Sequence, residues 1–197
     1  MLVVTTMTNT KDKILKSALK LFSQKGYLGT TTKEIAKEAG VAEVTLFRYF
    51  LSKENLFTEV LKSQSFLPTL QDLIPKLRKM DYLDALETTA KYYLDLLKRK
   101  RDLICIMHTE MFQYPSQIKS IHSKIIHEVY LVFAQYLDEL KKDEKIRQNI
   151  NTEQASLAYF GMLFSLFIKK ELLKKRIDLK RTLQTYIEIF YEGTRRI

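Results

Sequence analysis

The chain has 197 residues, of which 46% are hydrophobic, and its formal net charge is +10. The apolar content excludes an intrinsically disordered chain, and the length is sufficient for one or two domains with a sizeable core. The basic excess suits a polyanionic partner, but it is spread over the sequence, with +4 in residues 1–65 and +6 in residues 66–197, so charge alone predicts no binding site.

The composition predicts an all-α protein. Gly and Pro, which break helices, number only 5 and 3, and no stretch alternates with period two for long. The first expected helix follows a loose tail at residues 1–8 and runs from Thr10 to Lys25, with Asn9 as its cap. Its apolar face is formed by Ile14, Leu15, Ala18, Leu19 and Phe22.

Residues 31–53, TTKEIAKEAGVAEVTLFRYFLSK, predict two short helices joined by a tight turn. Thr31 is an N-cap, and Glu34 three residues later completes a capping box. Gly40 ends the first helix, because only a residue without Cβ enters the left-handed region cheaply. The second helix is expected from Glu43 to Phe50. This order is the helix-turn-helix pattern, whose second helix enters the major groove of DNA.

The run T-x-x-E-I-A-x-E-A-G-V-A-x-x-T-L-F-R-Y-F-x-S-K-E-N-L-F resembles the signature of TetR-type transcriptional regulators, over about Lys11 to Leu56. Val44 stands where the family has a small residue, and Phe47 stands where a tyrosine is common. The resemblance implies a ligand-responsive, homodimeric regulator that is not an enzyme. We therefore expect a helix-turn-helix DNA-binding domain at 1–52 and a ligand-binding and dimerisation domain at 53–197.

The exposed side of the second helix is expected to read DNA. A carboxylate at Glu43 can accept from a cytosine amino group, whereas Val44 or Thr45 can contact a thymine methyl. An equal alternative for Glu43 is a partner of the helix dipole without base contact. Phosphate and guanine contacts are expected from basic and hydroxyl side chains nearby. The complete expected set is Thr32, Lys33, Glu43, Val44, Thr45, Arg48, Tyr49 and Lys53.

The remaining sequence predicts seven further helices. Proline affects the first two of them. The first is expected to end near Phe66, because Leu67 precedes Pro68, and the second is expected to be short or kinked, because it contains Pro75. The basic run Lys98–Arg101 is interpreted as a solvated helix end, where cations suit the dipole. The expected ranges are Lys53–Phe66, Thr69–Met80, Asp81–Lys98, Asp102–Phe112, Pro115–Lys142, Thr152–Lys170 and Asp178–Thr194.

The last two helices are expected to form a subunit interface. Residues 155–168 are apolar around most of the helix, which must therefore be buried on several sides. The TetR resemblance implies a four-helix bundle made from the last two helices of each subunit, and we expect Leu166 and Ile187 to lie in it. The alternative is that this pair covers only its own core.

The resemblance also implies an inducer pocket in the second domain. Aromatic and methionine side chains line such pockets, although they also fill cores. A small apolar ligand such as a fatty acid or acyl thioester fits them, whereas a lipophilic cation would need Glu110 or Glu128. The candidate ligand-binding residues are Phe66, Tyr92, Met107, His108, Met111, Phe112, Tyr130, Phe133, Phe160 and Phe164.

No catalytic residue, metal site or cofactor is expected, because the sequence has no H-E-x-x-H, nucleophile elbow or phosphate loop. A single cysteine, Cys105, excludes an intrachain disulfide. No signal peptide or membrane span is expected, so the predicted location is cytoplasmic. Either Met1 or Met7 can be the native start. The competing functions are a constitutive DNA-binding protein without an inducer and a helical lipid carrier.

Overall fold

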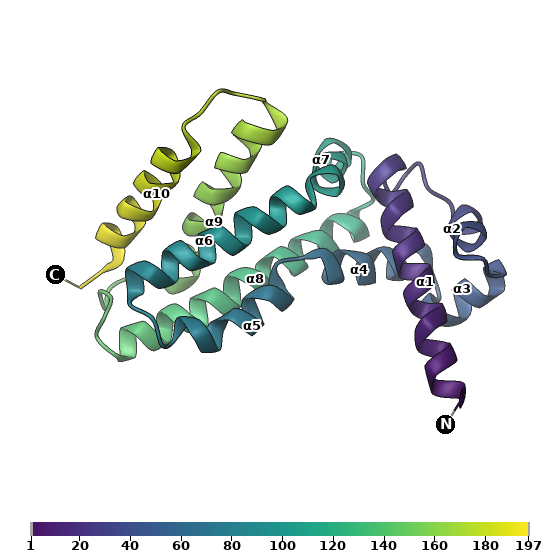
Figure 1. Ribbon diagram of the computed structural model, residues 1–197, viewed down its shortest axis with the longest axis horizontal. Helices are drawn as coiled ribbons and strands as arrows, with labels where there is room; N and C mark the ends of the chain where they lie inside the picture. The colour runs from purple at the N-terminus through teal and green to yellow at the C-terminus, as the bar shows by residue number, and fades with distance from the viewer. Residues whose placement is uncertain (1, 197) are drawn as a thin grey trace. The chain divides into compact units, whose positions relative to one another are not determined.

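The computed structural model describes the backbone of residues 2–196 and the side chains of residues 10–196. In this range the backbone forms helices and no strand, as the sequence predicted (Figure 1). A π-helical turn at Ile168–Leu172 follows α9. The α-helices are α1 (Leu2–Lys25), α2 (Thr32–Ala39), α3 (Glu43–Phe50), α4 (Lys53–Gln64), α5 (Leu67–Leu77), α6 (Tyr82–Arg99), α7 (Arg101–Glu110), α8 (Ser116–Lys142), α9 (Thr152–Phe167) and α10 (Leu179–Thr194).

Helix α1 begins at Leu2, so the predictions of a loose tail over residues 2–8 and of a cap at Asn9 are wrong. Residue 1 lies outside the described residues. No Gly or Pro precedes Gly26, so nothing in the sequence interrupts the helix before its end. Gly26 then takes a φ of 73°, which turns the chain out of α1.

The chain divides into two compact units. The head unit contains the residues up to Gln64 together with residues 102–124, and the body unit contains residues 65–101 and 125–197. The sequence predicted a division after residue 52, but α4, α7 and the first part of α8 group with the head unit. The head unit is therefore assembled from two separate segments of the sequence.

In the head unit, α1 packs against α2 and α4, and α3 packs against α2 and α4. Helices of eight residues such as α2 and α3 are unstable alone, so they depend on this packing. The rings of Phe22 and Phe57 meet edge to face, with 4.9 Å between their centroids. The buried apolar side chains include Ile14, Ala18, Phe22, Ile35, Leu46, Phe50, Leu56 and Phe57.

In the body unit, α6 packs against α5, α9 and α10, and α9 and α10 form an antiparallel pair that Figure 1 shows side by side. In this core the buried Tyr159 hydroxyl donates to the Leu86 carbonyl at 2.5 Å. The polar segment before α9 is tied to the C-terminal residues, because the Arg147 N–H donates to the Thr194 carbonyl at 2.9 Å.

No helix in the described range has the length and apolar character needed to cross a bilayer. Among the described side chains, no group of three or more His, Cys, Asp or Glu residues is arranged to hold a metal ion.

Candidate nucleic-acid interface

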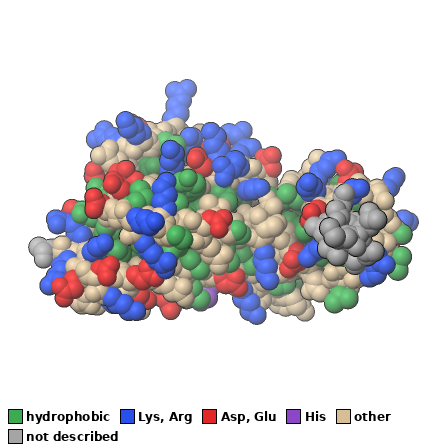
Figure 2. All heavy atoms as spheres, turned by 60° about the horizontal axis from the view of Figure 1, so that its bottom comes forward, with side chains coloured by type: hydrophobic (Ala, Val, Ile, Leu, Met, Phe, Trp, Pro, Cys, Tyr) green, Lys and Arg blue, Asp and Glu red, His purple; other side chains and the backbone are tan. Residues whose placement is uncertain are grey.

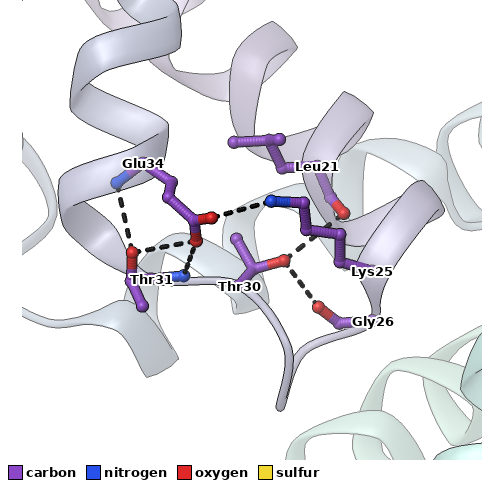
Figure 3. Close-up of polar contacts among 6 residues, drawn as sticks. All are labelled: Leu21, Lys25, Gly26, Thr30, Thr31 and Glu34. Atoms are coloured by element: carbon purple, nitrogen blue, oxygen red, sulfur yellow. Dashed lines mark hydrogen bonds and ion pairs between the residues drawn. The ribbon is translucent and has the colours of Figure 1, made fainter.

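Helix α2 begins with the predicted capping box (Figure 3). The Glu34 N–H donates to the Thr31 hydroxyl at 3.2 Å, and the Thr31 N–H donates back to the Glu34 carboxylate at 2.9 Å. The buried Thr30 fixes the preceding loop, because its hydroxyl donates to the Gly26 carbonyl at 2.7 Å. The N-terminus of α2 is therefore fixed both by the capping box and by the hydrogen bond of Thr30 in the preceding loop.

The Glu34 carboxylate also receives the Lys25 ammonium at 2.7 Å, as Figure 3 shows. The hydrogen bond from Lys25 and those from the Thr31 backbone and hydroxyl lower the pKa of Glu34 to about 2. This exposed group therefore links the end of α1 to the first turn of α2 as an anion over the whole neutral range.

The turn between α2 and α3 follows the sequence prediction. Gly40 has φ 68° and ψ 35°, the left-handed conformation, and the Val41 N–H donates to the Ala36 carbonyl at 3.0 Å. Leu51, which follows α3, also has a positive φ of 63°, although it carries a side chain. Ser52 then caps α4, since its hydroxyl accepts from the Asn55 N–H at 3.1 Å.

Helix α3 has distinct inner and outer faces. Leu46 and Phe50 are buried, whereas Val44 is 75% exposed and Arg48 is exposed. Because residues four apart share a helix face, Val44 and Arg48 form the outer side. Glu43 lies three residues before Leu46 and seven before Phe50, which puts it on the edge of the inner face.

Glu43 and Thr32, both predicted to contact DNA, contact each other. The Thr32 hydroxyl donates to the Glu43 carboxylate at 2.6 Å. This bond joins the first turn of α2 to the first turn of α3. Glu43 therefore connects α2 to α3 by a hydrogen bond, and its negative charge is also stabilised by the dipole at the N-terminus of α3.

Lys53 lies over the ring of Tyr27, with its nitrogen 4.2 Å from the ring centroid. The Tyr27 hydroxyl donates to the Glu54 carboxylate at 2.9 Å. Burial lowers the pKa of Lys53 and raises that of Tyr27, whose bond to Glu54 raises it further. Lys53, predicted to clamp a phosphate, is therefore also packed against the end of α1.

Glu110, at the end of α7, receives two hydrogen bonds inside the head unit. Its carboxylate accepts from the Tyr27 N–H at 3.0 Å and from the Tyr114 hydroxyl at 2.9 Å. Burial and this bond raise the pKa of Tyr114. The contact that joins Tyr27, Glu110 and Tyr114 was not predicted, because no local pattern links positions 27 and 110, which are separated by 83 residues. Glu110 is thus engaged by the head unit, and Glu128 is exposed.

The other predicted DNA-contact residues lie on α2 and α3. Lys33 is exposed and Thr45 is half-buried. The Arg48 guanidinium lies 5.7 Å from the centroid of the half-buried Tyr49 ring. Apolar side chains reach the surface around α2 and α3, and Lys and Arg are spread over the whole face that Figure 2 shows. On the face shown, the cations form no concentrated patch, so the candidate interface is identified by α3 and its neighbours rather than by charge.

The predicted ligand-binding residues divide between the units. Phe66, Tyr130, Phe133 and Phe160 come together in the body unit, where the Phe160 centroid lies 5.2 Å from that of Phe133 and 6.0 Å from that of Phe66. Phe164 is half-buried on α9, and Tyr92 is 41% exposed. The residues in the head unit are Met107, which is buried, Met111, which is half-buried, and His108 and Phe112, which are exposed.

Comparison with known proteins identifies the family. Residues 14–60 match the family model of the bacterial regulatory proteins, tetR family. The regulator QacR of Staphylococcus aureus (strain Mu50 / ATCC 700699) is 32% identical over 136 residues, which cover 64% of this chain and 70% of QacR. The regulator YvkB of Bacillus subtilis (strain 168) is 28% identical over 171 residues, which cover 87% of this chain and 88% of YvkB.

Among solved structures, the regulator FadR of Bacillus subtilis, in complex with stearoyl-CoA, superposes with a TM-score of 0.72 at 19% identity. The superposition covers 92% of this chain and 97% of FadR, and at this identity it shows a shared fold. The similarity to QacR and the match of residues 14–60 to the family model establish that the chain belongs to the TetR family of helix-turn-helix transcriptional regulators.

Proposed function

We propose that this regulator binds a palindromic operator as a homodimer, represses transcription there, and is released by a small apolar inducer. The observation that carries the proposal is helix α3, which is braced on its inner side and presents Val44, Thr45 and Arg48 outward. A short helix held in this way suits insertion into the major groove. Repression needs only that the protein occupies the operator and blocks transcription there. A regulator that binds the operator in this way is expected to be cytoplasmic.

Phosphate contacts are assigned to Lys33, Arg48, Tyr49 and Lys53 around this helix. Thr32 and Glu43 receive a different role from the one expected from the sequence. Because their side chains bond to each other at 2.6 Å, we assign them to the positioning of α3 rather than to direct base contact. This favours the alternative that Glu43 touches no base.

The homodimer is assigned to the outward faces of α9 and α10. Each face carries an exposed large apolar residue followed one turn later by a glycine: Leu157 and Gly161 on α9, and Ile189 and Gly193 on α10. A Cβ built on either glycine meets nothing within 4 Å. Glycine in a helix costs about 1 kcal/mol relative to alanine, so a close approach of another helix would account for these two positions.

The expectation that Leu166 and Ile187 face the partner subunit is wrong. Leu166 is 0% and Ile187 is 4% exposed in the single chain, so both already lie in the core of their own subunit. The large apolar residues that a partner can reach on these helices are Leu157 and Ile189, which are 45% and 59% exposed.

The inducer is assigned to the aromatic cluster of the body unit, around Phe66, Phe133 and Phe160. Near this cluster the Tyr136 ring lies 5.8 Å from that of Phe133. The Tyr136 hydroxyl is buried and has no hydrogen-bond partner among the described residues. A donor in an apolar core suits a ligand with a long apolar chain and a carbonyl or carboxylate oxygen. We therefore favour a fatty acid or acyl thioester.

The test begins with selection of bound duplexes from a random library, followed by affinity measurements against salt concentration. We expect one palindromic sequence to be enriched, and Arg48→Ala to weaken binding and reduce the salt slope by about one. Lys98→Ala, an exposed cation of the body unit, serves as the matched control. The absence of any enriched sequence would contradict operator binding and would leave a helical lipid carrier as the remaining candidate function.

The inducer is tested on the operator complex formed in this way. Fatty acids and acyl thioesters of graded length are titrated against it, with lipophilic cations in parallel. We expect release by one acyl class and a weaker response in Tyr136→Phe. A complex that resists every ligand identifies a constitutive DNA-binding protein, whereas release by cations alone contradicts the acyl assignment.

A further inference from the structure

The surface of α3 and its C-terminal end is unusually apolar for a face that meets DNA. Val44, Phe47 and Leu51 are 75%, 40% and 77% exposed. They account for three of the nine large apolar side chains that are exposed in the described part of the chain, and they lie within eight residues. A cluster of this kind on α3 points to a contact surface with an apolar group, because single exposed apolar residues are common but grouped ones mark contact surfaces.

The outer face of α3 offers few hydrogen-bonding groups to bases. Glu43 is engaged by Thr32 at 2.6 Å, and Arg48 is the exposed donor at the centre of the face. Phe47 has no hydroxyl, and Val44 has no polar side-chain atom. Residues 43–50 contain no Asn, Gln or Lys, so Arg48 is the only side chain among them of the types that usually pair with adenine or guanine edges.

Double-stranded DNA presents one apolar group in its major groove, the C5-methyl group of thymine. The cations around the apolar cluster, which include Lys33, Arg48 and Lys53, suit the flanking phosphates. Charge complementarity and chemical type thus point to the same occupant, a thymine-bearing duplex. A lipid surface or a protein groove would match the apolar cluster but would not require the family's helix-turn-helix arrangement around it.

We propose that Val44 and Phe47 determine operator sequence by contact with thymine methyl groups. This inference rests on the proposed operator binding and names the feature of the operator that the site recognises. The expected half-site carries adjacent or alternating thymines where the outer face of α3 enters the groove. Specificity then depends on apolar contact and shape, while Arg48 and the neighbouring cations bind the flanking phosphates.

The experiment uses the full-length protein and the operator obtained by selection. Each thymine of the operator is replaced in turn by deoxyuridine, which removes only the methyl group and leaves every base-pairing and groove hydrogen-bonding atom in place. For the wild type we expect a loss of about three- to fivefold in affinity at one or two positions per half-site, the size expected for burial of one methyl group. Replacement in both half-sites should multiply the losses.

The variants connect each methyl group to a side chain. Val44→Ala should abolish the uracil effect at one position, and Phe47→Ala should abolish it at a neighbouring position, while both variants retain binding to the thymine operator at reduced affinity. Leu28→Ala is the matched control, since Leu28 is an exposed apolar residue of the same unit outside α3. It should retain the full uracil effect.

Two outcomes overturn the inference. One is wild-type binding to the fully uracil-substituted operator as tight as to the thymine operator. The other is a uracil effect that persists unchanged in both Val44→Ala and Phe47→Ala. In either case the operator is still bound specifically, so these failures are distinct from a failure of the proposed function, in which no operator is selected at all.

Discussion

The backbone N–H of Tyr27 donates to the carboxylate of Glu110 at 3.0 Å, across 83 positions of the sequence. The same carboxylate accepts from the Tyr114 hydroxyl at 2.9 Å, and a Cβ on Gly26 would lie 1.9 Å from its Oε1 atom. The end of α1 and the end of α7 are therefore fitted to each other through one carboxylate, and glycine at position 26 makes room for it.

The first prediction concerns this contact. Glu110→Ala leaves the Tyr27 N–H and the Tyr114 hydroxyl without their acceptor, so the free energy of unfolding should fall by about 1–3 kcal/mol. Urea unfolding followed by circular dichroism measures the change. Glu128→Ala removes an exposed carboxylate from α8 and should change stability by less than about 0.5 kcal/mol. Equal effects of the two substitutions would show that the contact contributes nothing specific.

The second prediction concerns the bond between Thr32 and Glu43. Thr32→Val and Glu43→Ala should each weaken binding to all operator variants by a similar factor, because each removes one partner of this hydrogen bond and loosens α3 without removing a base contact. The double variant should bind no worse than the weaker single variant, since both changes break one interaction. Affinities for a panel of operators with single base-pair changes give the answer. A change of preference at one base pair in Glu43→Ala would support the base-reading role.

The third prediction concerns Leu51, whose φ of 63° is unfavourable for a residue with a side chain. Leu51→Gly should raise the free energy of unfolding by up to about 1 kcal/mol, because relief of the strain exceeds the entropy that glycine adds to the unfolded chain. Leu51→Ala retains the strain and should not be stabilising. Thermal unfolding of the three proteins compares them, and a less stable Leu51→Gly protein would contradict the strained geometry.

The fourth prediction concerns pH. The pKa of Glu34 is about 2 in the folded chain and 4.5 as its ordinary value. Because the folded value is lower, the contribution of this carboxylate to stability is present above about pH 4.5 and is lost as the pH falls towards 2. The urea midpoints of the wild type and Glu34→Gln should therefore differ at pH 6 and converge towards pH 2. In a Lys25→Met background the difference should be smaller throughout. A constant difference across this range would exclude an ionic contribution.

The fifth prediction concerns the subunit interface. Leu157→Lys and Ile189→Lys place a charge on the outward faces of α9 and α10, so each should yield folded monomers with much weaker operator binding. Sedimentation velocity and circular dichroism distinguish dissociation from unfolding. Leu166→Lys is the contrasting case, since Leu166 is fully buried and its substitution should unfold the subunit. Folded dimers of both exposed-site variants would place the interface elsewhere.

The parts of the structure that sequence reasoning predicted are those set by neighbours along the chain. The capping box of Thr31 and Glu34 and the left-handed Gly40 depend on residues at most a few positions apart, and each was found as expected. The face of α3 on which Glu43 lies could also have been predicted, because the buried Leu46 and Phe50 follow it at spacings of three and seven. The expectation that Glu43 contacts a base considered only its position near the start of the helix and not this face.

The remaining features depend on chain segments that meet only after folding. Nothing in the local sequence of Glu110 distinguishes a carboxylate that binds Tyr27 from one that faces a cationic ligand. Likewise, Leu166 and Leu157 lie on one apolar helix, and only packing decides which of them is covered by its own subunit. Sequence periodicity fails there because α9 is apolar on most sides.

The discontinuous head unit has a consequence for the order of events during synthesis. Tyr114 packs its ring against those of Tyr27 and Phe57, with centroid distances of 6.0 and 6.2 Å. The ribosome must add about fifty residues after α4 before this ring is available, which takes roughly 3–10 s at ordinary elongation rates. During that interval the nascent head has an uncovered aromatic face, so the competent reading head is completed only after the first segment of the body unit, residues 65–101, has been translated.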